Sequence, residues 1–252
     1  MRVASKVGVV LTAVALSVPI GAAGASVHTD GSSGAVKSKI GAGHLVSPAA
    51  GVHSAEAQFR VPKITCARAD DLEALWLGIS AFEGTAGAGD NDLYAQVRAA
   101  CVYGRISYLA EVAAPGTRVA SIAVAAGDLI DVAIHGDCVK PGCTAATVQR
   151  IATGTTTQLL NVTGTAPTNA GGVEQSVLFG QQGLILAVPN FVDSSTGSSS
   201  VYFVATWLNG SATWRQNTPA VQLHQANHHT EIKSSTLGTP KGQFRLSFVS
   251  NY

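Results

Sequence analysis

Short runs of β-branched and aromatic residues recur from about Ala55 to the C-terminus, and turn-forming residues separate them. The turn signals include Pro115-Gly116 and Asn209-Gly210. Regularly spaced short strands of this kind are typical of a sandwich or a barrel, and no segment shows a long amphipathic helical period. The sequence therefore predicts an all-β domain. Strands are expected at 57–64, 72–79, 93–103, 105–112, 118–124, 129–135, 146–152, 156–162, 172–178, 184–188, 200–208, 212–216, 230–234 and 243–249.

The composition limits the size of this domain and its partners. The chain has 252 residues, of which 46% are hydrophobic and only 12% are charged. A chain of this length can bury one sizeable core, and sandwiches of this size are commonly a single domain. The formal net charge of +1 at pH 7 provides no broad attraction to nucleic acids or to anionic membranes. We therefore expect no nucleic-acid partner.

The N-terminus has the order of features found in a secretory signal peptide. Arg2 and Lys6 are followed by an apolar run at 7–20, and then by the small residues Ala23-Gly24-Ala25. The alternative is an uncleaved membrane anchor, but the run is shorter than the roughly 20 residues that a membrane span needs. We expect residues 1–25 to be removed, and the mature protein to be secreted, extracellular and not bound to the membrane.

The segment that follows differs in composition from the rest of the chain. Residues 26–54 are rich in Gly, Ser, Ala and His and show no periodic apolar spacing. Such composition is typical of a flexible linker or of a short pro-segment. The predicted domain order is a signal peptide at 1–25, a linker or pro-segment at 26–54, and a β-sandwich domain at 55–252.

Four cysteines provide two candidate disulfides. They are Cys66, Cys101, Cys138 and Cys143. Exported proteins meet an oxidising environment, and four cysteines allow three connectivities. Cys138 and Cys143 bracket the turn-forming stretch Val-Lys-Pro-Gly, so we expect them to pair with each other. Cys66 is then expected to pair with Cys101.

Common catalytic motifs are missing from the sequence. It has no Gly-x-Ser-x-Gly elbow, no phosphate-binding loop and no paired-aspartate tripeptide. His224, His228 and His229 lie close together, but spacing of four residues serves a metal only on a helix, and the flanks are not helical in pattern. We interpret this cluster as a polar loop, and we expect neither a metal nor a cofactor.

A series of short motifs does carry information about function. A Phe-x-Val-Pro motif, a Cys and a Trp-x-Gly-Ile motif open the predicted domain. Next come a strand with Gln, Cys and Gly, and a Tyr-containing strand that ends in Pro. A Gly-Asp turn, a Glu-containing strand and an aromatic strand that begins with Gly then follow in that order. Their positions are 59–62, Cys66, 76–79, Gln96, Cys101, Gly104, Tyr108, Pro115, Gly127-Asp128, 173–178 and 242–246. This order resembles that of the eqolisin family, the glutamic endopeptidases that act in acid, and the chain is similar to a divergent, bacterial-type member.

The resemblance implies a fold, a reaction and a set of site residues. The fold is a concanavalin-like sandwich of two antiparallel sheets, with a groove that binds an extended polypeptide. By position, Gln96 and Glu174 become the catalytic pair. A carboxylate at Glu174 takes a proton from water, and the N–H groups of Gln96 stabilise the oxyanion. Trp76 and Glu111 become substrate-binding residues. The implied protein is a monomeric peptidase that needs no cofactor.

The sequence also departs from the eqolisin pattern at several places. Ser80 stands where the family has Asp, Gln175 where it has Trp, and Leu178 where direct spacing puts the second Glu of the motif. Val97-Arg98 replaces a small residue and a Gly after Gln96, and Glu111 is out of register unless a gap is placed nearby. These departures favour an alternative, in which the protein is a secreted sandwich that binds a peptide or a carbohydrate without turnover. The two hypotheses differ in whether Gln96 and Glu174 converge on one face.

Overall fold

A computed structural model describes the chain from residue 28 to residue 249, in separate ranges. The described residues are 28–29, 36–38, 41–46, 52–66, 72–82, 93–114, 117–135, 143–152, 155–165, 176–182, 188–211, 220–225, 230–235 and 242–249. The elements in these ranges are all strands. Across the same ranges, no helix has the length and apolarity that a membrane crossing would require. The predicted signal peptide at 1–25 lies outside the described residues.

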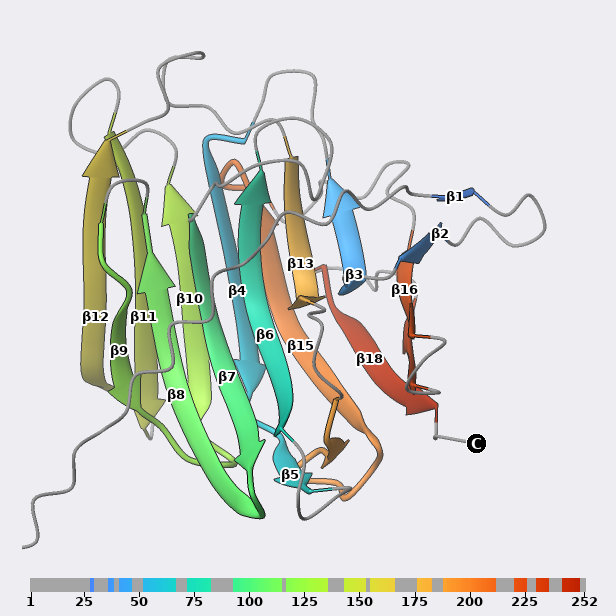
Figure 1. Ribbon diagram of the computed structural model, residues 1–252. Helices are drawn as coiled ribbons and strands as arrows, with labels where there is room; N and C mark the ends of the chain where they lie inside the picture. The colour runs from blue at the N-terminus through green and yellow to red at the C-terminus, as the bar shows by residue number, and fades with distance from the viewer. Residues whose placement is uncertain are drawn as a thin grey trace, which may run out of the picture.

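The strands are short and follow one another closely, as the sequence pattern predicts (Figure 1). Their bounds are β1 His28–Thr29, β2 Val36–Ser38, β3 Gly41–Val46, β4 Ser54–Arg60, β5 Lys63–Thr65, β6 Leu72–Phe82, β7 Tyr94–Val102, β8 Arg105–Ala113, β9 Ala120–Ala123, β10 Leu129–His135, β11 Cys143–Ala152, β12 Thr155–Thr165, β13 Ser176–Gln182, β14 Asn190–Val192, β15 Ser200–Leu208, β16 Ala220–Gln225, β17 Thr230–Ser234 and β18 Phe244–Val249.

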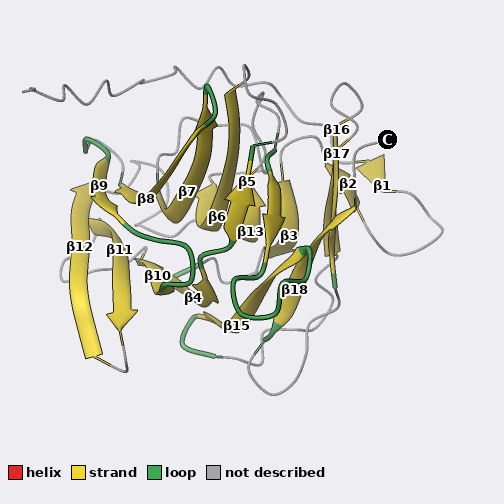
Figure 2. Cartoon of the chain, turned by 90° about the horizontal axis from the view of Figure 1, so that it is seen from below, coloured by secondary structure: helices red, strands yellow, loops and turns green. Residues whose placement is uncertain are grey.

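One long sheet folds back on itself to make a sandwich. Its main hydrogen-bonded path runs β12-β11-β10-β4-β15-β18-β17-β16-β3-β13-β6-β7-β8-β9, and β5 pairs separately with β14. Strands β8, β7, β6 and β13 form one layer, and β11, β10, β4 and β15 form the layer behind it (Figures 1 and 2). The main-path pairs are antiparallel, and the predicted sandwich of antiparallel sheets is therefore confirmed.

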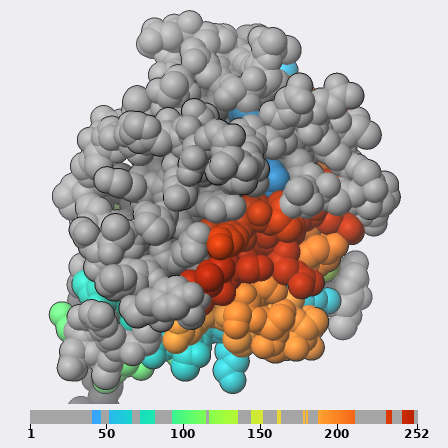
Figure 3. All heavy atoms as spheres, turned by 90° about the vertical axis from the view of Figure 1, so that its right-hand side faces the viewer, coloured from blue at the N-terminus to red at the C-terminus, as the bar shows by residue number. Residues whose placement is uncertain are grey.

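The core lies between the two layers because alternate residues of the facing strands are apolar. On β4, Ala55, Ala57 and Phe59 are buried, while the residues between them are half-buried. Phe203 of β15 lies between Phe59 and Phe244, with ring centroids 5.0 Å and 4.4 Å apart. Burying each such ring stabilises the fold by about 1.5–3 kcal/mol. β15 and β18, which carry two of these rings, lie side by side at the surface in Figure 3.

Part of the predicted linker is a strand. Gly41–Val46 form β3, which pairs with β13 on one side and with β16 on the other. Ala42 is fully buried and Val46 is 5% exposed. Residues 41–46 are thus a strand inside the segment whose composition suggested a linker or a pro-segment, because pairing with strands far along the chain overrides a local sequence rich in glycine. Strand β16, which contains His224, was also not predicted, whereas His228 and His229 lie outside the described residues.

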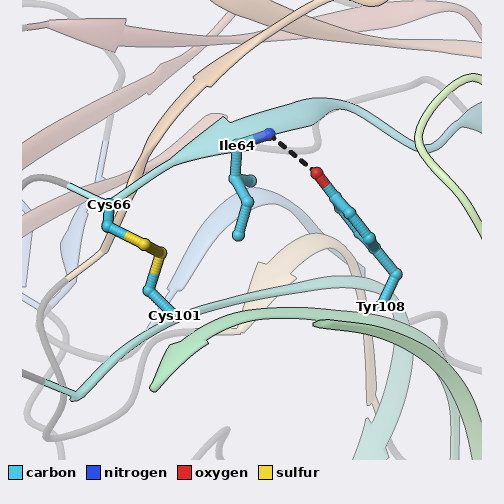
Figure 4. The surroundings of a disulfide bond; sticks show 4 residues. All are labelled: Ile64, Cys66, Cys101 and Tyr108. Carbon is cyan, nitrogen blue, oxygen red and sulfur yellow. Dashed lines mark hydrogen bonds between the residues drawn. A yellow bond between two sulfur atoms is a disulfide. The ribbon is translucent and has the colours of Figure 1, made fainter. Parts of the chain in front are cut away.

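A disulfide joins the start of the domain to the central strands. Cys66 and Cys101 are bonded, with their Cα atoms 5.6 Å apart, as predicted (Figure 4). Nearby, the backbone N–H of Ile64 donates a hydrogen bond to the Tyr108 hydroxyl at 3.0 Å. Cys138 and the side chain of Cys143 lie outside what the structure describes, so their pairing stays a prediction.

Candidate functional site

Three neighbouring strands carry polar side chains on the face that points away from the core. On β6, Leu75 and Leu77 are fully buried between the layers, and so is Val97 on β7. Because strand side chains alternate, Trp76 of β6 and Gln96 of β7 are placed on the opposite, outer face. The sequence resemblance had selected both residues, and the structure brings them to one face.

Cross-strand register places Glu111 directly beside Gln96. Gln96 lies opposite Gly78 of β6 on one side and opposite Glu111 of β8 on the other. Directly opposed residues in an antiparallel pair have Cβ atoms about 4.5–5.5 Å apart, which allows their side chains to interact. Glu111 therefore belongs to the same site as Gln96, although direct sequence spacing puts it out of register with the family motif.

An ion pair ties Glu111 to Arg98. The Nε of Arg98 donates a hydrogen bond to Oε1 of Glu111 at 2.8 Å. The Arg98 side chain is 32% exposed and the Glu111 side chain is 11% exposed. Arg98 lies on β7 two residues after Gln96, and directly opposite Trp76. The outer face of these strands thus holds one compact cluster, which consists of Trp76, Gln96, Arg98 and Glu111.

Gln96 is a largely buried residue whose carboxamide reaches the surface of the described part of the chain. Gln96 is only 5% exposed, and none of the described residues hydrogen-bonds its side chain. A carboxamide has both N–H donors and a carbonyl acceptor. An amide in this place can donate to, or accept from, a polar group of a ligand.

Three glycines on neighbouring strands lie in a row across the sheet, next to Gln96. Gly43 of β3 lies opposite Gly180 of β13, Gly180 opposite Gly78, and Gly78 opposite Gln96. All three glycines have positive φ. A Cβ at Gly78 would lie 2.2 Å from the Ala95 carbonyl oxygen and 2.6 Å from the Gln96 Cα. Backbone thus fills the space beside Gln96, and only glycine fits there.

The second member of the expected catalytic pair is not located. Glu174 lies outside the described residues, so its position relative to Gln96 stays a prediction. Two of the positions at which this chain departs from the family motif lie next to each other. Leu178 is 6% exposed and lies directly opposite Ser80 on β6. In the described part of the site, Glu111 is the carboxylate beside Gln96.

A second pair of carboxyl groups lies on the other layer. Asp131 of β10 accepts a hydrogen bond from Nε2 of Gln58 at 2.8 Å. Burial raises the pKa of Asp131, and it also raises the pKa of Glu56, on which the nearby Asp131 charge acts in the same direction. Glu56 and Gln58 lie on β4, between residues that face the core. This pair is therefore separate from the Gln96 cluster.

Arg98 is the residue of this site that sequence reasoning did not select. It was visible only as a departure, because the family has Gly where this chain has Arg98. Its ion pair with Glu111 depends on how β7 and β8 are aligned, because the two residues are diagonal neighbours on these strands. The sequence alone does not give this alignment. A charged residue two positions from a suspected catalytic residue, and therefore on the same face of the predicted strand, was the available signal.

Comparison with known proteins identifies the fold. No protein-family profile matches the chain, and no curated protein matches its sequence. The crystal structure of scytalido-glutamic peptidase with a peptide-based transition-state analogue matches with a TM-score of 0.55 and 15% identity, over 84% of this chain and 98% of that one. SCP-B, a member of the eqolisin family of peptidases in complex with the tripeptide Ala-Ile-His, matches with a TM-score of 0.53 and 16% identity, over 84% and 98%. The chain therefore has the β-sandwich fold of these peptidases.

Proposed function

We propose that this protein is a secreted acid endopeptidase of the glutamic type, which hydrolyses peptide bonds of an extended polypeptide. The observation that carries the proposal is the position of Gln96, which is 5% exposed, makes no side-chain hydrogen bond to a described residue, and lies directly beside Glu111. The glutamic-peptidase fold supports it, because the structural neighbours include a complex with a peptide-based transition-state analogue. In this proposal the ligand that satisfies Gln96 is the scissile carbonyl.

The proposed reaction needs two groups from the chain. A carboxylate at Glu174 takes a proton from a water molecule as that water attacks the scissile carbonyl, and the proton then passes to the leaving amine. The N–H groups of Gln96 donate to the oxygen that becomes negative, which stabilises the tetrahedral intermediate. Trp76 and Glu111 contact the substrate in this scheme. No covalent intermediate is required.

The proposal includes export and maturation. Residues 1–25 are removed as a signal peptide, and the mature protein acts outside the cell as a monomer that does not stay on the membrane. The Cys66–Cys101 disulfide is consistent with an oxidising compartment. N-terminal sequencing of secreted protein is expected to give a start at or after Ser26.

Amide and carboxylate substitutions test the reaction. Glu174→Gln should lower kcat/KM for cleavage of an unfolded protein in acid by about 100-fold or more, because it removes the proton acceptor. Gln96→Ala should lower it by a similar or larger factor, since the loss of an oxyanion donor costs roughly 3 kcal/mol. Glu56→Gln is the matched control, because it changes a strand carboxyl on the other layer and should leave kcat/KM unchanged. Far-UV circular dichroism must show that all three variants are folded.

The outcome also decides which carboxylate acts. If Glu174→Gln cleaves as fast as the wild type while Glu111→Gln does not, the base is Glu111 and the assignment of Glu174 is wrong. If the wild type cleaves no unfolded protein between about pH 2 and pH 5, where a carboxyl of ordinary pKa changes charge, the peptidase proposal fails.

Two observations favour a second candidate, a secreted module that binds peptide or carbohydrate without cleaving it. Leu178 stands at a position where the family motif has Glu, and a buried Leu cannot move a proton. Glu111, the described carboxylate beside Gln96, is already bonded to Arg98. This candidate predicts saturable binding by the wild type with no cleavage, and weaker binding by Gln96→Ala. Calorimetric titration with unstructured peptides and with oligosaccharides distinguishes its two possible ligands.

A further inference from the structure

We propose that Arg98 is a specificity-determining residue that binds a carboxylate of the peptide, which is either an acidic side chain or the C-terminal carboxylate. The inference rests on the proposed function in one respect, because it takes the ligand of the Gln96 cluster to be an extended peptide. Arg98 stands where the eqolisin pattern has a Gly after Gln, so it adds a positive charge at a place where the pattern has no side chain.

The guanidinium group of Arg98 has N–H groups left over for a ligand. Its Nε donates to Oε1 of Glu111 at 2.8 Å, and none of the described residues bonds its two terminal nitrogens. The side chain is 32% exposed, so a ligand can reach it. An arginine fork matches the geometry of a carboxylate and forms short, charge-assisted hydrogen bonds with it. Glu111 therefore orients the fork and leaves its outer edge available.

The neighbours of Arg98 strengthen its attraction for an anion. Trp76 lies directly opposite on β6, and Leu109 lies directly opposite on β8. Both are half-buried, so apolar groups flank the guanidinium on the two sides. Charges interact more strongly beside low-dielectric groups than in bulk water. Glu111 works against binding, because its negative charge partly cancels that of Arg98.

The spacing along β7 sets where the carboxylate falls on the peptide. Arg98 follows Gln96 by two residues on one face of the strand, which is a distance of roughly 7 Å between their Cα atoms. An extended peptide covers the same distance in about two residues. If Gln96 binds the scissile carbonyl, the recognised carboxylate lies within about two residues of the scissile bond.

Matched peptides test this inference on the exported, disulfide-bonded protein at about pH 5, where a peptide carboxyl is ionised. One set carries Asp or Asn at successive positions, and a second set ends in a free acid or an amide. Dissociation constants from calorimetry, or kcat/KM where cleavage occurs, should favour the ionised member of a pair about 10- to 100-fold. Preference confined to the first set identifies an acidic side chain, and preference confined to the second identifies the C-terminus.

Substitutions then assign the preference to Arg98. Arg98→Gln should abolish it, Arg98→Lys should keep part of it, and Glu111→Gln should increase it. Arg105→Gln is the matched control, because Arg105 is an exposed residue at the tip of the same β7–β8 hairpin; its preference should equal that of the wild type. Arg98→Lys keeps the test valid if Arg98→Gln does not fold.

The failures of the two proposals are distinguishable. Peptides that bind or are cleaved equally well with and without a carboxylate would overturn the role of Arg98 and leave the proposed function standing. A preference that survives in both Arg98 variants would also overturn it. Absence of binding and cleavage for every peptide would overturn both proposals together.

Discussion

Gly78 shows how one missing side chain positions the carboxamide of Gln96. With φ of +155°, Gly78 adopts a backbone conformation that other residues rarely reach, and its neighbour on β7 is Gln96. Any larger residue would push against the Ala95 carbonyl and the Gln96 backbone. The glycine therefore sets the distance between β6 and β7 at the point where the site is built.

Gly78→Ala should lower the free energy of unfolding by about 2–5 kcal/mol, because backbone strain and overpacking add. Gly197→Ala is the control, since Gly197 also has positive φ, +70°, but nothing lies within 4 Å of the added Cβ. It should cost only the backbone term, about 1–2 kcal/mol. Urea unfolding monitored by circular dichroism gives both values. If both substitutions lower the free energy of unfolding equally, β7 moves away from the added methyl group at no cost in stability, which contradicts this prediction.

Single residues of the site differ in how far the sequence predicts them. Gln96 and Trp76 each belong to a motif that lies within a single strand. Because side chains along a strand alternate between its two faces, both residues are expected on the face away from the core. Glu111 and Arg98 meet diagonally across two strands, and their contact depends on register. Register is set by the turn at Tyr103-Gly104 and by the buried faces of both strands, which a local motif does not contain.

Strand β3 shows the same limit at the level of elements. Its sequence, GAGHLV, has two glycines and little β propensity, so composition predicts a linker. In the fold it fills the position between β13 and β16, and it carries buried Ala42 and His44. The long strands β6, β7 and β8 were predictable because each has its own run of apolar, β-branched and aromatic residues. β3 was not, because its partners are far away in sequence.

Truncation tests whether β3 is part of the folded domain. A chain that starts at Val36 keeps β2 and β3, and we expect it to unfold cooperatively like the protein that starts at Ser26. A chain that starts at Val52 lacks β3 and leaves the edges of β13 and β16 unpaired. It should lose about 5 kcal/mol or more, which approaches the whole stability of a typical domain. Thermal unfolding of the three chains gives their midpoint temperatures. Equal midpoints for all three would contradict this prediction.

This result also restricts where a pro-segment can end. Cleavage before Gly41 leaves β3 in the sheet, whereas cleavage near residue 54 would remove a central strand. If the protein is activated by removal of a pro-segment, we therefore expect the cut to fall between residues 25 and 41.

At the scale of the whole molecule, buried titratable groups in two regions respond to acid in opposite directions. Burial of His44 lowers its pKa from an ordinary value of 6.5 to about 4, although the hydrogen bond from Nε2 to the Ser235 carbonyl acts in the other direction. Glu56 and Asp131 have raised pKa values, chiefly because of burial. An acid-acting enzyme needs a fold that tolerates low pH, so the balance between these groups matters for the proposed function.

The sign of each effect follows from proton linkage. His44 is neutral in the folded protein, whereas the unfolded chain takes up a proton at this residue below its ordinary pKa. Its contribution to stability is therefore complete above pH 6.5 and is lost as the pH falls through about 4. The Glu56 and Asp131 contribution is complete below their ordinary pKa values, and it is lost as the pH rises through the raised values. Acidification thus weakens the region of β3 and strengthens the pair on β4 and β10.

His44→Gln should flatten the acid side of the stability curve. The substituted amide can still donate to the Ser235 carbonyl, but it does not titrate, so the loss between pH 6.5 and pH 4 should shrink by roughly 3 kcal/mol. Its stability at pH 7 should fall by a few kcal/mol at most, since the edge contact with Phe244 is lost. Glu56→Gln is the opposite control, because it should raise stability at neutral pH, where a buried Glu56 charge is unfavourable, change stability little in acid, and leave the His44-dependent slope nearly unchanged. Urea unfolding of the wild type and both variants, at intervals from pH 3 to pH 8, measures these slopes. If His44→Gln retains the full acid-dependent loss, the destabilising proton binds elsewhere in the chain.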